Sequence, residues 1–304
     1  MKLPKISVVV AAYNEEEYLG RLLKSLVNQN YKSFEVIIVD DGSTDNTVKI
    51  AESYNKKLNL KILKQNHKGP GEARNLGAKH ANGEFIAFLD ADMVCDPNSL
   101  KNLVEPLLAH KEWPGTVHNL EKVANPENVW ALCAGKIRKR SKIGSKDNAF
   151  RLIRKSKFLE AGGFNTSLGY FDDGTLASKI GKAKVVEAVF YHNNPESLQE
   201  ILKQDRWIGK SYPFSLIIKR FFPIVLIFVL FVIISLYYLS VIQALLISLI
   251  MILLVLCFVS FKKALREKNL KLLFFMPVFI LVRIAGKLYG IISKIFRREK
   301  IPVK

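Results

Sequence analysis

The longest uncharged stretch of the chain runs from Phe221 to Ser260 and contains no acidic or basic side chain. About 20 apolar residues are enough for one helix to cross a ~30 Å hydrocarbon core, so this stretch is long enough for two helices. Acidic residues lie mostly before Gln204. We therefore expect a globular domain over residues 1–210 and a membrane region over residues 211–304.

Within the membrane region, Phe222 to Ser240 and Val241 to Ser260 are expected to form a helical hairpin over about 221–260. Basic side chains flank both ends of this hairpin: Lys219, Arg220, Lys262, Lys263, Arg266, Lys268 and Lys271. The positive-inside rule then predicts that both ends are cytosolic. The sequence thus predicts a multi-pass membrane protein whose first, catalytic domain is cytosolic.

A third apolar segment, about 271–296, is less suited to a full crossing. It contains Pro277, and Arg283, Lys287 and Lys294 recur at helical spacing in its second half. Crossing would bury Arg283 near the bilayer midplane at a cost of ~3 kcal/mol. We expect a kinked helix that lies in or dips into the cytosolic interface, with its basic face toward the headgroups. A crossing helix is the alternative if Arg283 and Lys287 face a protein partner or the hairpin.

The formal net charge of +19 is concentrated beside the apolar segments. Residues 211–304 hold 14 basic and 2 acidic side chains, whereas residues 1–210 hold 32 and 25. Membrane lipids with anionic headgroups are the expected partners, and nothing in the sequence resembles a nucleic-acid-binding module. The three cysteines are scattered, which argues against a disulfide framework and fits a reducing cytosol. The N-terminus shows no apolar signal region, which also favours a cytosolic first domain.

The first domain alternates strand patterns with helix patterns, which is typical of an α/β domain built from βαβ units. The expected strands are Ile6–Ala12, Phe34–Val39, Leu60–Leu63, Gly83–Asp92 and Lys184–Tyr191. The expected helices are Leu19–Leu26, Glu72–Ala81 and Pro97–His110. The segment Trp113–Asn128 lacks a clear period, and we expect it to be a loop.

Acidic residues come directly after two of these strands. Asp40 and Asp41 follow the second strand, and Asp90 and Asp92 end the fourth, with small Ala91 between them. Alternate residues of a strand share a face, so Asp90 and Asp92 are expected on one side. A divalent cation is the usual partner that makes two neighbouring carboxylates favourable. All four carboxylates are expected at the carboxyl edge of the sheet, where open α/β sheets bind ligands.

Four motifs then stand in a fixed order. They are Ala12-Tyr13-Asn14-Glu15, Val39-Asp40-Asp41-Gly42-Ser43-Thr44-Asp45, Asp90-Ala91-Asp92, and Gly162-Gly163-Phe164-Asn165 followed by Asp172-Asp173. With this ordered set, the chain resembles the family 2 glycosyltransferases over residues 4–210. The resemblance implies the GT-A fold, a Rossmann-like nucleotide-diphospho-sugar transferase domain with a mixed sheet, followed here by C-terminal transmembrane helices.

The resemblance also implies binding roles. A nucleoside diphosphate sugar would be bound by Ala12, Tyr13, Glu15, Asp40, Asp41, Arg74, Asp90 and Ala91. Asp92, assisted by Asp90, would hold Mg²⁺ or Mn²⁺ on the diphosphate, since these hard cations prefer oxygen ligands. His192 stands where many members have a histidine near the metal, and a structural role at a strand end is its alternative.

The resemblance implies the catalytic residue as well. Asp173 matches the second acid of the family's Glu-Asp pair, which implies a general base and inversion at the anomeric carbon. Asp172, the second catalytic candidate, stands where the family has Glu, and its shorter side chain would change how this acid reaches the acceptor. Both acids also open a helical pattern, so favourable contacts with a helix dipole are the alternative role.

Two sequence regions bear on the acceptor. The segment Lys136–Lys157 holds ten basic residues and one acid, and offers Arg138 and Arg140 to an anionic, lipid-linked acceptor. A solvated basic surface is the alternative. Arg206 and Trp207 match the end of the Gln-x-x-Arg-Trp motif of processive members.

This chain lacks a motif residue of each of the two alternative enzyme classes. Lys203 stands where the processive polysaccharide synthases have Gln, and Met93-Val94 follows Asp92 where polyprenyl-phosphate sugar synthases usually have Leu-Gln. We therefore expect transfer to a hydroxyl or phosphate of a lipid-linked or glycan acceptor, as in cell-envelope glycan synthesis. The two synthase classes are kept as alternatives.

Two other protein classes fit the sequence less well. Sugar nucleotidyltransferases need a glycine-rich, basic loop after the first strand, and Ala11–Glu17 is acidic. A binding module without catalysis would be expected to lack Asp92 or Asp173, and both are present. The sequence therefore predicts a metal-dependent inverting glycosyltransferase at the cytosolic face of a membrane.

Overall fold

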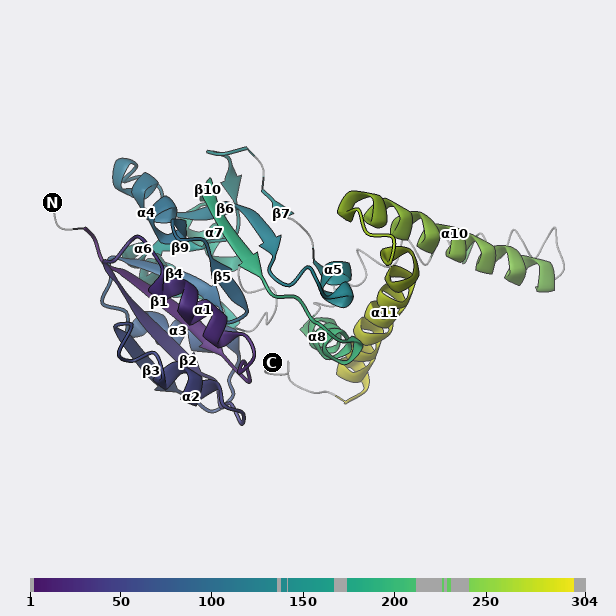
Figure 1. The fold of residues 1–304 in the computed structure, drawn as a ribbon, viewed down its shortest axis with the longest axis horizontal. Coiled ribbons are helices and arrows are strands. Elements are labelled where there is room, and N and C mark those ends of the chain that lie inside the picture. Colours follow the sequence, from purple (N-terminus) through teal and green to yellow (C-terminus); the bar gives the residue numbers. More distant parts are fainter. Residues whose placement is uncertain are drawn as a thin grey trace. The chain divides into compact units, whose positions relative to one another are not determined.

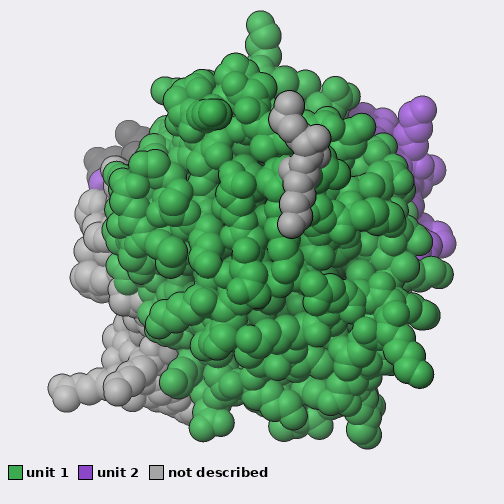
Figure 2. All heavy atoms as spheres, turned by 90° about the vertical axis from the view of Figure 1, so that its left-hand side faces the viewer, with its two compact units in different colours: residues 1–126, 135–194, 301–304 green, residues 127–134, 195–300 purple. Residues whose placement is uncertain are grey.

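The computed structural model describes residues 3–135, 138–140, 142–166, 174–211, 226, 229–230 and 241–297. Asp172, Asp173 and nearly all of the expected hairpin arm Phe222–Ser240 lie outside the described residues. The chain divides into two compact units (Figure 2). Unit 1 comprises Met1–Pro126, Gly135–Asn194 and Ile301–Lys304, and unit 2 comprises Glu127–Ala134 and Pro195–Lys300.

Unit 1 is built on one mixed sheet with the strand order β3-β2-β1-β4-β9-β6-β10-β5 (Figure 1). β7 pairs with β6 and β8 pairs with β10 beside this path. The strands are β1 (Ile6–Ala12), β2 (Phe34–Asp40), β3 (Leu60–Lys64), β4 (Phe85–Asp90), β5 (Met93–Cys95), β6 (Gly115–Val123), β7 (Arg138–Lys139), β8 (Lys146–Asp147), β9 (Leu152–Arg154) and β10 (Ala183–His192). β1, β2, β3 and β4 run parallel, whereas β9 joins the sheet antiparallel to β4 and β6.

Helices cover both faces of this sheet. They are α1 (Leu19–Val27), α2 (Thr47–Glu52), α3 (Pro70–Lys79), α4 (Ser99–Ala109), α6 (Lys155–Glu160) and α7 (Gly174–Ile180). Alternate residues of β1 point to opposite faces, so Val8 and Val10 pack with α1 and α4, and Val9 packs with α3 and α6. The sheet is thus the middle of three layers, as its continuous apolar strands predict.

Two local expectations were wrong. The segment Trp113–Asn128, expected as a loop, contains the nine-residue strand β6. Its buried side chains include His118 and Glu121, and these polar residues hide the strand from a reading of apolar period. The strand before the acids ends at Asp90, and Asp92 lies in the following turn, so the two acids do not share a strand face.

Unit 2 is helical and contains α5 (Val129–Ala134), α8 (Leu198–Ser211), α10 (Val241–Glu267) and α11 (Leu272–Arg297). One apolar cluster joins these four helices. It contains Leu132 of α5, Ile201 of α8, Ala264 near the end of α10, and Met276 of α11. Two stretches, Leu246–Glu267 and Leu272–Ser293, are long and apolar enough to cross a membrane. Along α10 the large side chains from Leu246 to Phe261 are mostly exposed.

Candidate active site

The carboxyl edge of the parallel strands brings two of the predicted acids to either side of β1. Ala12 lies opposite Asp40 on β2, and Ala11 lies opposite Asp90 on β4. Asp40 is buried, and its Oδ1 accepts a hydrogen bond from the Ser43 backbone N–H at 3.1 Å. The register of three parallel strands therefore builds this part of the site.

The side chain of Asp41 is held by the loop that leads into α3. Its Oδ1 accepts from Gln65 Nε2 at 2.6 Å and from the Lys68 N–H at 2.7 Å, and its Oδ2 accepts from the Gly69 N–H at 2.9 Å. Only 2% of the residue is exposed. Because both carboxylate oxygens have partners, Asp41 fixes the path of this loop.

The Tyr13 motif lies beside the same loop. The rings of Tyr13 and His67 are in contact, with centroids 4.1 Å apart and planes tilted by 34°. The next residues are held by the segment after β2, because the Asn14 N–H donates to Ser43 Oγ at 2.9 Å and the Glu15 N–H donates to Thr47 Oγ1 at 2.7 Å. The segment after β2 and the loop held by Asp41 thus fix the backbone of the Tyr13 motif and the ring contact beside it.

Asp90 lies between two arginines. Its Oδ1 accepts from Arg74 Nη2 at 2.9 Å, and its Oδ2 is 3.5 Å from Arg151 Nη1. Burial by itself would raise the pKa of Asp90, but the Arg74 and Arg151 guanidinium groups outweigh this effect and hold that pKa well below its ordinary range. Arg151 also donates to the Phe88 carbonyl oxygen at 2.8 Å, which ties it to β4.

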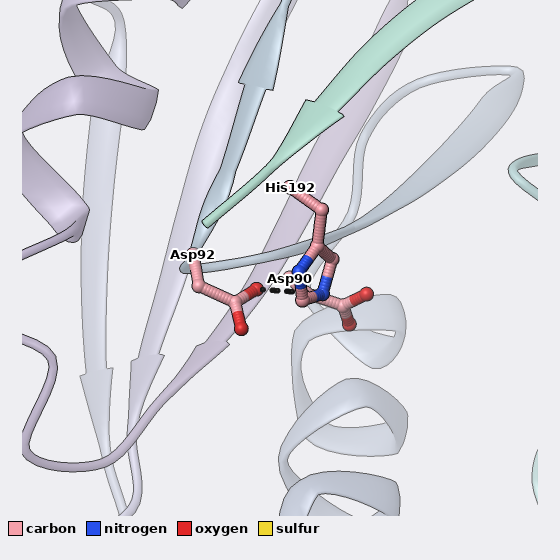
Figure 3. A group of neighbouring side chains, drawn as sticks. All are labelled: Asp90, Asp92 and His192. Atoms are coloured by element: carbon pink, nitrogen blue, oxygen red, sulfur yellow. Dashed lines mark ion pairs between the residues drawn. The ribbon is translucent and has the colours of Figure 1, made fainter. Parts of the chain in front are cut away.

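Asp92 and His192 meet because β5 pairs antiparallel with the end of β10. Met93 lies opposite His192 in this pairing, so the preceding residue, Asp92, lies against the imidazole. His192 Nε2 is 3.5 Å from Asp92 Oδ1 (Figure 3). Asn193 holds the turn in place, since its backbone N–H and its Nδ2 both donate to the Asp92 carbonyl oxygen, at 2.9 and 2.8 Å.

These side chains fit a metal ion. One ligand atom from each of Asp90, Asp92 and His192 lies within 4.8 Å of the others. Asp92 Oδ1 is buried and accepts no hydrogen bond from any residue that the structure describes. A buried carboxylate oxygen that accepts no hydrogen bond is costly, and a divalent cation is a ligand that would satisfy it beside His192. The carboxylate and imidazole donors suit Mn²⁺ as well as Mg²⁺.

The sequence analysis missed two residues at this site. Arg151 was read only as part of a basic run, and Asn193 was not singled out. Their partners are 63 and 101 positions away, so no local pattern marks either residue. The single available signal was that Asn193 follows His192 directly.

Two of the predicted acceptor residues, Arg140 and Arg206, have partners within their own units. Arg140 Nη1 is 2.6 Å from His118 Nε2, and its Nε is 3.4 Å from Asp147 Oδ2. Arg206 lies on α8, with its guanidinium 4.4 Å from the centre of the Tyr289 ring. Arg138 lies on β7, Trp207 lies on α8, and Ala91 is buried in the turn before Asp92.

Residues 7–160 match the family model described as "Glycosyl transferase family 2". Among curated proteins, a "Poly(ribitol-phosphate) beta-N-acetylglucosaminyltransferase TarS" of Staphylococcus aureus is 47% identical over 102 residues, which are 32% of this chain and 18% of TarS. The match therefore spans less than a fifth of that relative's length. The "GalNAc(5)-diNAcBac-PP-undecaprenol beta-1,3-glucosyltransferase" of Campylobacter jejuni is 31% identical over 216 residues, 67% of each chain.

Solved structures share the fold. The S. aureus TarS 1-349 complex with UDP-GlcNAc superposes with a TM-score of 0.51 at 25% identity, over 68% of this chain and 66% of that one. The mannosyltransferase PcManGT from Pyrobaculum calidifontis, solved with GDP-Man and Mn²⁺, has a TM-score of 0.56 at 19% identity, over 95% and 88%.

The expected fold class is confirmed, since unit 1 carries the mixed α/β sheet of the GT-A transferases. The family model covers half of the chain, and the Campylobacter relative extends the likeness to two thirds of it. The chain belongs to glycosyl transferase family 2.

Proposed function

We propose that the protein transfers a sugar from a nucleoside diphosphate sugar to an acceptor at a membrane. The observation that carries this proposal is the corner formed by Asp92 and His192, where a buried carboxylate oxygen has no hydrogen-bond partner among the described residues. The relatives support it, since TarS is named a transferase of N-acetylglucosamine and was solved with UDP-GlcNAc, and the Campylobacter relative is named a glucosyltransferase.

Asp92 and His192 are the residues that would hold Mg²⁺ or Mn²⁺. Such a cation, when bound, stabilises the negative charge that develops on the leaving diphosphate. Asp90 is the third candidate ligand, but two arginines already neutralise it. We therefore assign Asp90 the task of holding Arg74 at the site, where a guanidinium favours a negatively charged sugar nucleotide.

The nucleoside would bind where Tyr13, Glu15 and the loop held by Asp41 come together. The adjoining rings of Tyr13 and His67 would offer an apolar face to a base. The loop is preorganised by the three hydrogen bonds to Asp41, so little ordering is needed on binding.

Asp173 is proposed as the base that takes the proton of the acceptor, with inversion at the anomeric carbon. In Asp173→Asn, sugar nucleotide binding should stay normal while transfer drops roughly a hundredfold or more. Asp172→Asn is the matched control, and the loss there should be smaller. A folded Asp173→Asn variant that transfers sugar at the normal rate would refute the base role.

The acceptor is proposed to be lipid-linked. The Campylobacter relative, whose name includes an undecaprenol diphosphate acceptor, supports this class. Arg140 is engaged with His118 and Asp147, whereas Lys139 is exposed. Neutralising Arg138 and Lys139 together should therefore raise the KM for the acceptor and leave that for the sugar nucleotide unchanged. Equal changes in both constants would contradict this role.

We also propose that the protein is a multi-pass membrane protein with a cytosolic active site. Two helical stretches that are long and apolar enough to cross a membrane support membrane attachment, and the basic residues after α10 support a cytosolic end for that helix.

The decisive experiment is a screen of UDP-, GDP- and dTDP-sugars with the full chain in detergent, with Mn²⁺ and with a chelator. Metal-dependent release of a nucleoside diphosphate from one sugar nucleotide is the expected result. Release that a chelator does not affect would overturn the metal assignment, and no release with any donor would overturn the donor class.

A further inference from the structure

Helices α8 and α11 of unit 2 pack with their backbones almost in contact. A Cβ atom added to Gly209 of α8 would overlap the Lys287 carbonyl oxygen, and one added to Gly290 of α11 would overlap the Arg206 carbonyl oxygen. Only glycine permits so close an approach at these two positions. Residues 206–209 of α8 therefore lie beside residues 287–290 of α11. If one of these segments is in the membrane, the other must be at the same depth.

A buried ion-pair cluster lies in the same contact. Asp205 of α8 is fully buried, and its carboxylate accepts from Arg283 Nε at 2.8 Å and from Arg283 Nη2 at 3.0 Å. Lys287 Nζ lies 3.5 Å from the same carboxylate. Two of the basic residues of α11 thus face a protein partner, α8, instead of lipid headgroups. This is the arrangement for which the sequence left a crossing helix as the alternative, so the packing of α8 has to decide between the two orientations.

The outward faces of the two helices differ in polarity. On α11 the exposed stripe is apolar from Phe274 to Ile292 and includes Val278, Leu281, Ala285 and Leu288. On α8 the exposed stripe is polar and consists of Gln199, Lys203 and Arg206. Both stripes follow the i, i+4, i+7 spacing of a single helix face. The pair is therefore amphipathic as a unit, although α11 alone reads as a candidate membrane span.

We propose that α8 and α11 form one amphipathic layer that lies along the membrane interface, with the apolar stripe of α11 in the acyl chains. This inference rests on the membrane attachment proposed above. Asp205 acts as the internal counter-charge that lets Arg283 and Lys287 sit behind an apolar stripe. The lipid layer is the partner that the stripe fits, because α10, an exposed apolar helix, precedes α11 by four residues.

Full crossing by α11 conflicts with this packing. If α11 began at the cytosolic interface, Arg283 would lie ~16 Å deep and Gly290 ~27 Å deep, at ~1.5 Å per residue. Because α8 contacts α11 over these residues, it would carry Lys203 and Arg206 into or across the hydrocarbon core. Placing the Lys203 and Arg206 charges there is costly, although the Arg206 guanidinium lies against the Tyr289 ring. An orientation along the interface removes the conflict, since the α8 stripe then faces headgroups and water.

The test measures the depth of single probes along α11 in the full chain. Cys95 and Cys133 are buried, so replacing Cys257 with alanine leaves a background suited to labelling an introduced cysteine. Leu281, Leu288 and Ile292 are each replaced by cysteine and labelled with an environment-sensitive fluorophore. The protein is then reconstituted in vesicles of phosphatidylcholine and phosphatidylglycerol that carry quenchers near the headgroups or near the chain ends.

The interfacial orientation predicts equal, shallow depths for the three probes. A probe at Leu254 of α10 is the positive control and should be deep. A crossing helix would instead place Leu281 near the midplane and Ile292 ~16 Å farther along the bilayer normal, at ~1.5 Å per residue. Depths that change in this way from Leu281 to Ile292 would overturn the proposal.

A second measurement tests the counter-charge. Asp205→Asn leaves Arg283 and Lys287 without their anion, so its melting temperature in detergent should fall several degrees below that of the control Lys203→Gln. The exchange of charges in Asp205→Arg combined with Arg283→Asp should recover most of that loss. Equal melting temperatures for Asp205→Asn and the control would refute the role of Asp205.

Neither measurement requires turnover. Failure of the depth test would leave sugar transfer by the Asp92 site untouched. Failure of the sugar nucleotide screen would leave the orientation of α11 standing.

Discussion

Two acids at the same edge of the sheet, Asp41 and Asp92, differ in how their carboxylate oxygens are hydrogen-bonded. Both carboxylate oxygens of Asp41 accept hydrogen bonds, from Gln65, Lys68 and Gly69. Asp92 has a buried oxygen without a hydrogen-bond partner among the described residues. A satisfied carboxylate holds the protein's own backbone, whereas an unsatisfied one costs stability and is kept for a ligand. We propose that Asp41 shapes the site and that Asp92 binds a ligand there.

Removing the unsatisfied acid should have the largest effect on transfer. Loss of a residue that only orients a metal ligand typically lowers activity ~10–100-fold. Loss of the ligand itself, in Asp92→Ala, should therefore lower transfer by more than ~100-fold. Its melting temperature should be equal to or higher than that of the wild type, since a costly buried oxygen is removed. A Mn²⁺ titration of transfer and a thermal melt of the same preparation check these two effects. Wild-type turnover at limiting Mn²⁺ would contradict the metal role.

His192→Gln should have the next largest effect. Glutamine keeps a polar group near Asp92 but replaces the imidazole nitrogen, so the Mn²⁺ concentration for half-maximal transfer should rise ~10-fold or more. The maximal rate at saturating Mn²⁺ should change less. If His192 were only structural, the variant would melt earlier and its Mn²⁺ requirement would not move.

Asp41→Asn sharpens the other side of the comparison. The asparagine NH₂ group would face either the Gly69 N–H or the Gln65 and Lys68 donors, and two donors cannot form a hydrogen bond. The free energy of unfolding should therefore fall by ~1–3 kcal/mol. The loop then loosens beside Tyr13, and the KM for the sugar nucleotide should rise several-fold with little change in kcat. Kinetics and a thermal melt of one preparation test this. A raised KM with an unchanged melting temperature would mean that Asp41 serves only the ligand.

Glu35 is a second satisfied acid, far from the chemistry, and should not affect transfer at all. It accepts from Lys5 Nζ, Ser7 Oγ and the Asn82 N–H, at 2.7, 2.6 and 2.7 Å. Burial alone would raise the pKa of Glu35, but these hydrogen bonds outweigh it and lower that pKa from 4.5 to about 2. Its contribution of up to ~3 kcal/mol is therefore complete above the unfolded-state pKa and is lost as the pH falls toward 2.

This gives a pH test with a defined sign. At pH 7, Glu35→Gln should melt below the wild type while transferring sugar at the normal rate. The two melting temperatures should converge as the pH falls from about 4.5 toward 2, because the wild-type carboxyl becomes protonated in that window. A gap that stays constant over this range would show that the hydrogen bonds do not depend on the charge of Glu35.

The sequence by itself determined the architecture around the site, because those features are local. Apolar runs mark β1 and β2, and leucines at helical spacing mark α1. The Asp90-Ala91-Asp92 motif, together with its neighbours, indicated the glycosyltransferase family that the comparisons confirm. Each of these signals lies within a few residues of the chain.

Tertiary structure decided the rest, because pairing between distant segments has no local signature. β6 was hidden by buried His118 and Glu121, whose polarity is tolerated only because they contact each other and Arg140 lies beside them. Burial also lowers the pKa of His118 to about 4, so this histidine stays neutral within the sheet.

The same reason applies to both proposed sites. Asp92 was expected on a strand face, but the antiparallel pairing of β5 with β10 turns it toward His192, 100 residues later in the chain. Arg283 and Lys287 were expected at lipid headgroups, but Asp205, nearly 80 residues earlier, draws them into a helix contact. A charged side chain is visible in a sequence, whereas the partner that neutralises it is selected only when the chain has folded.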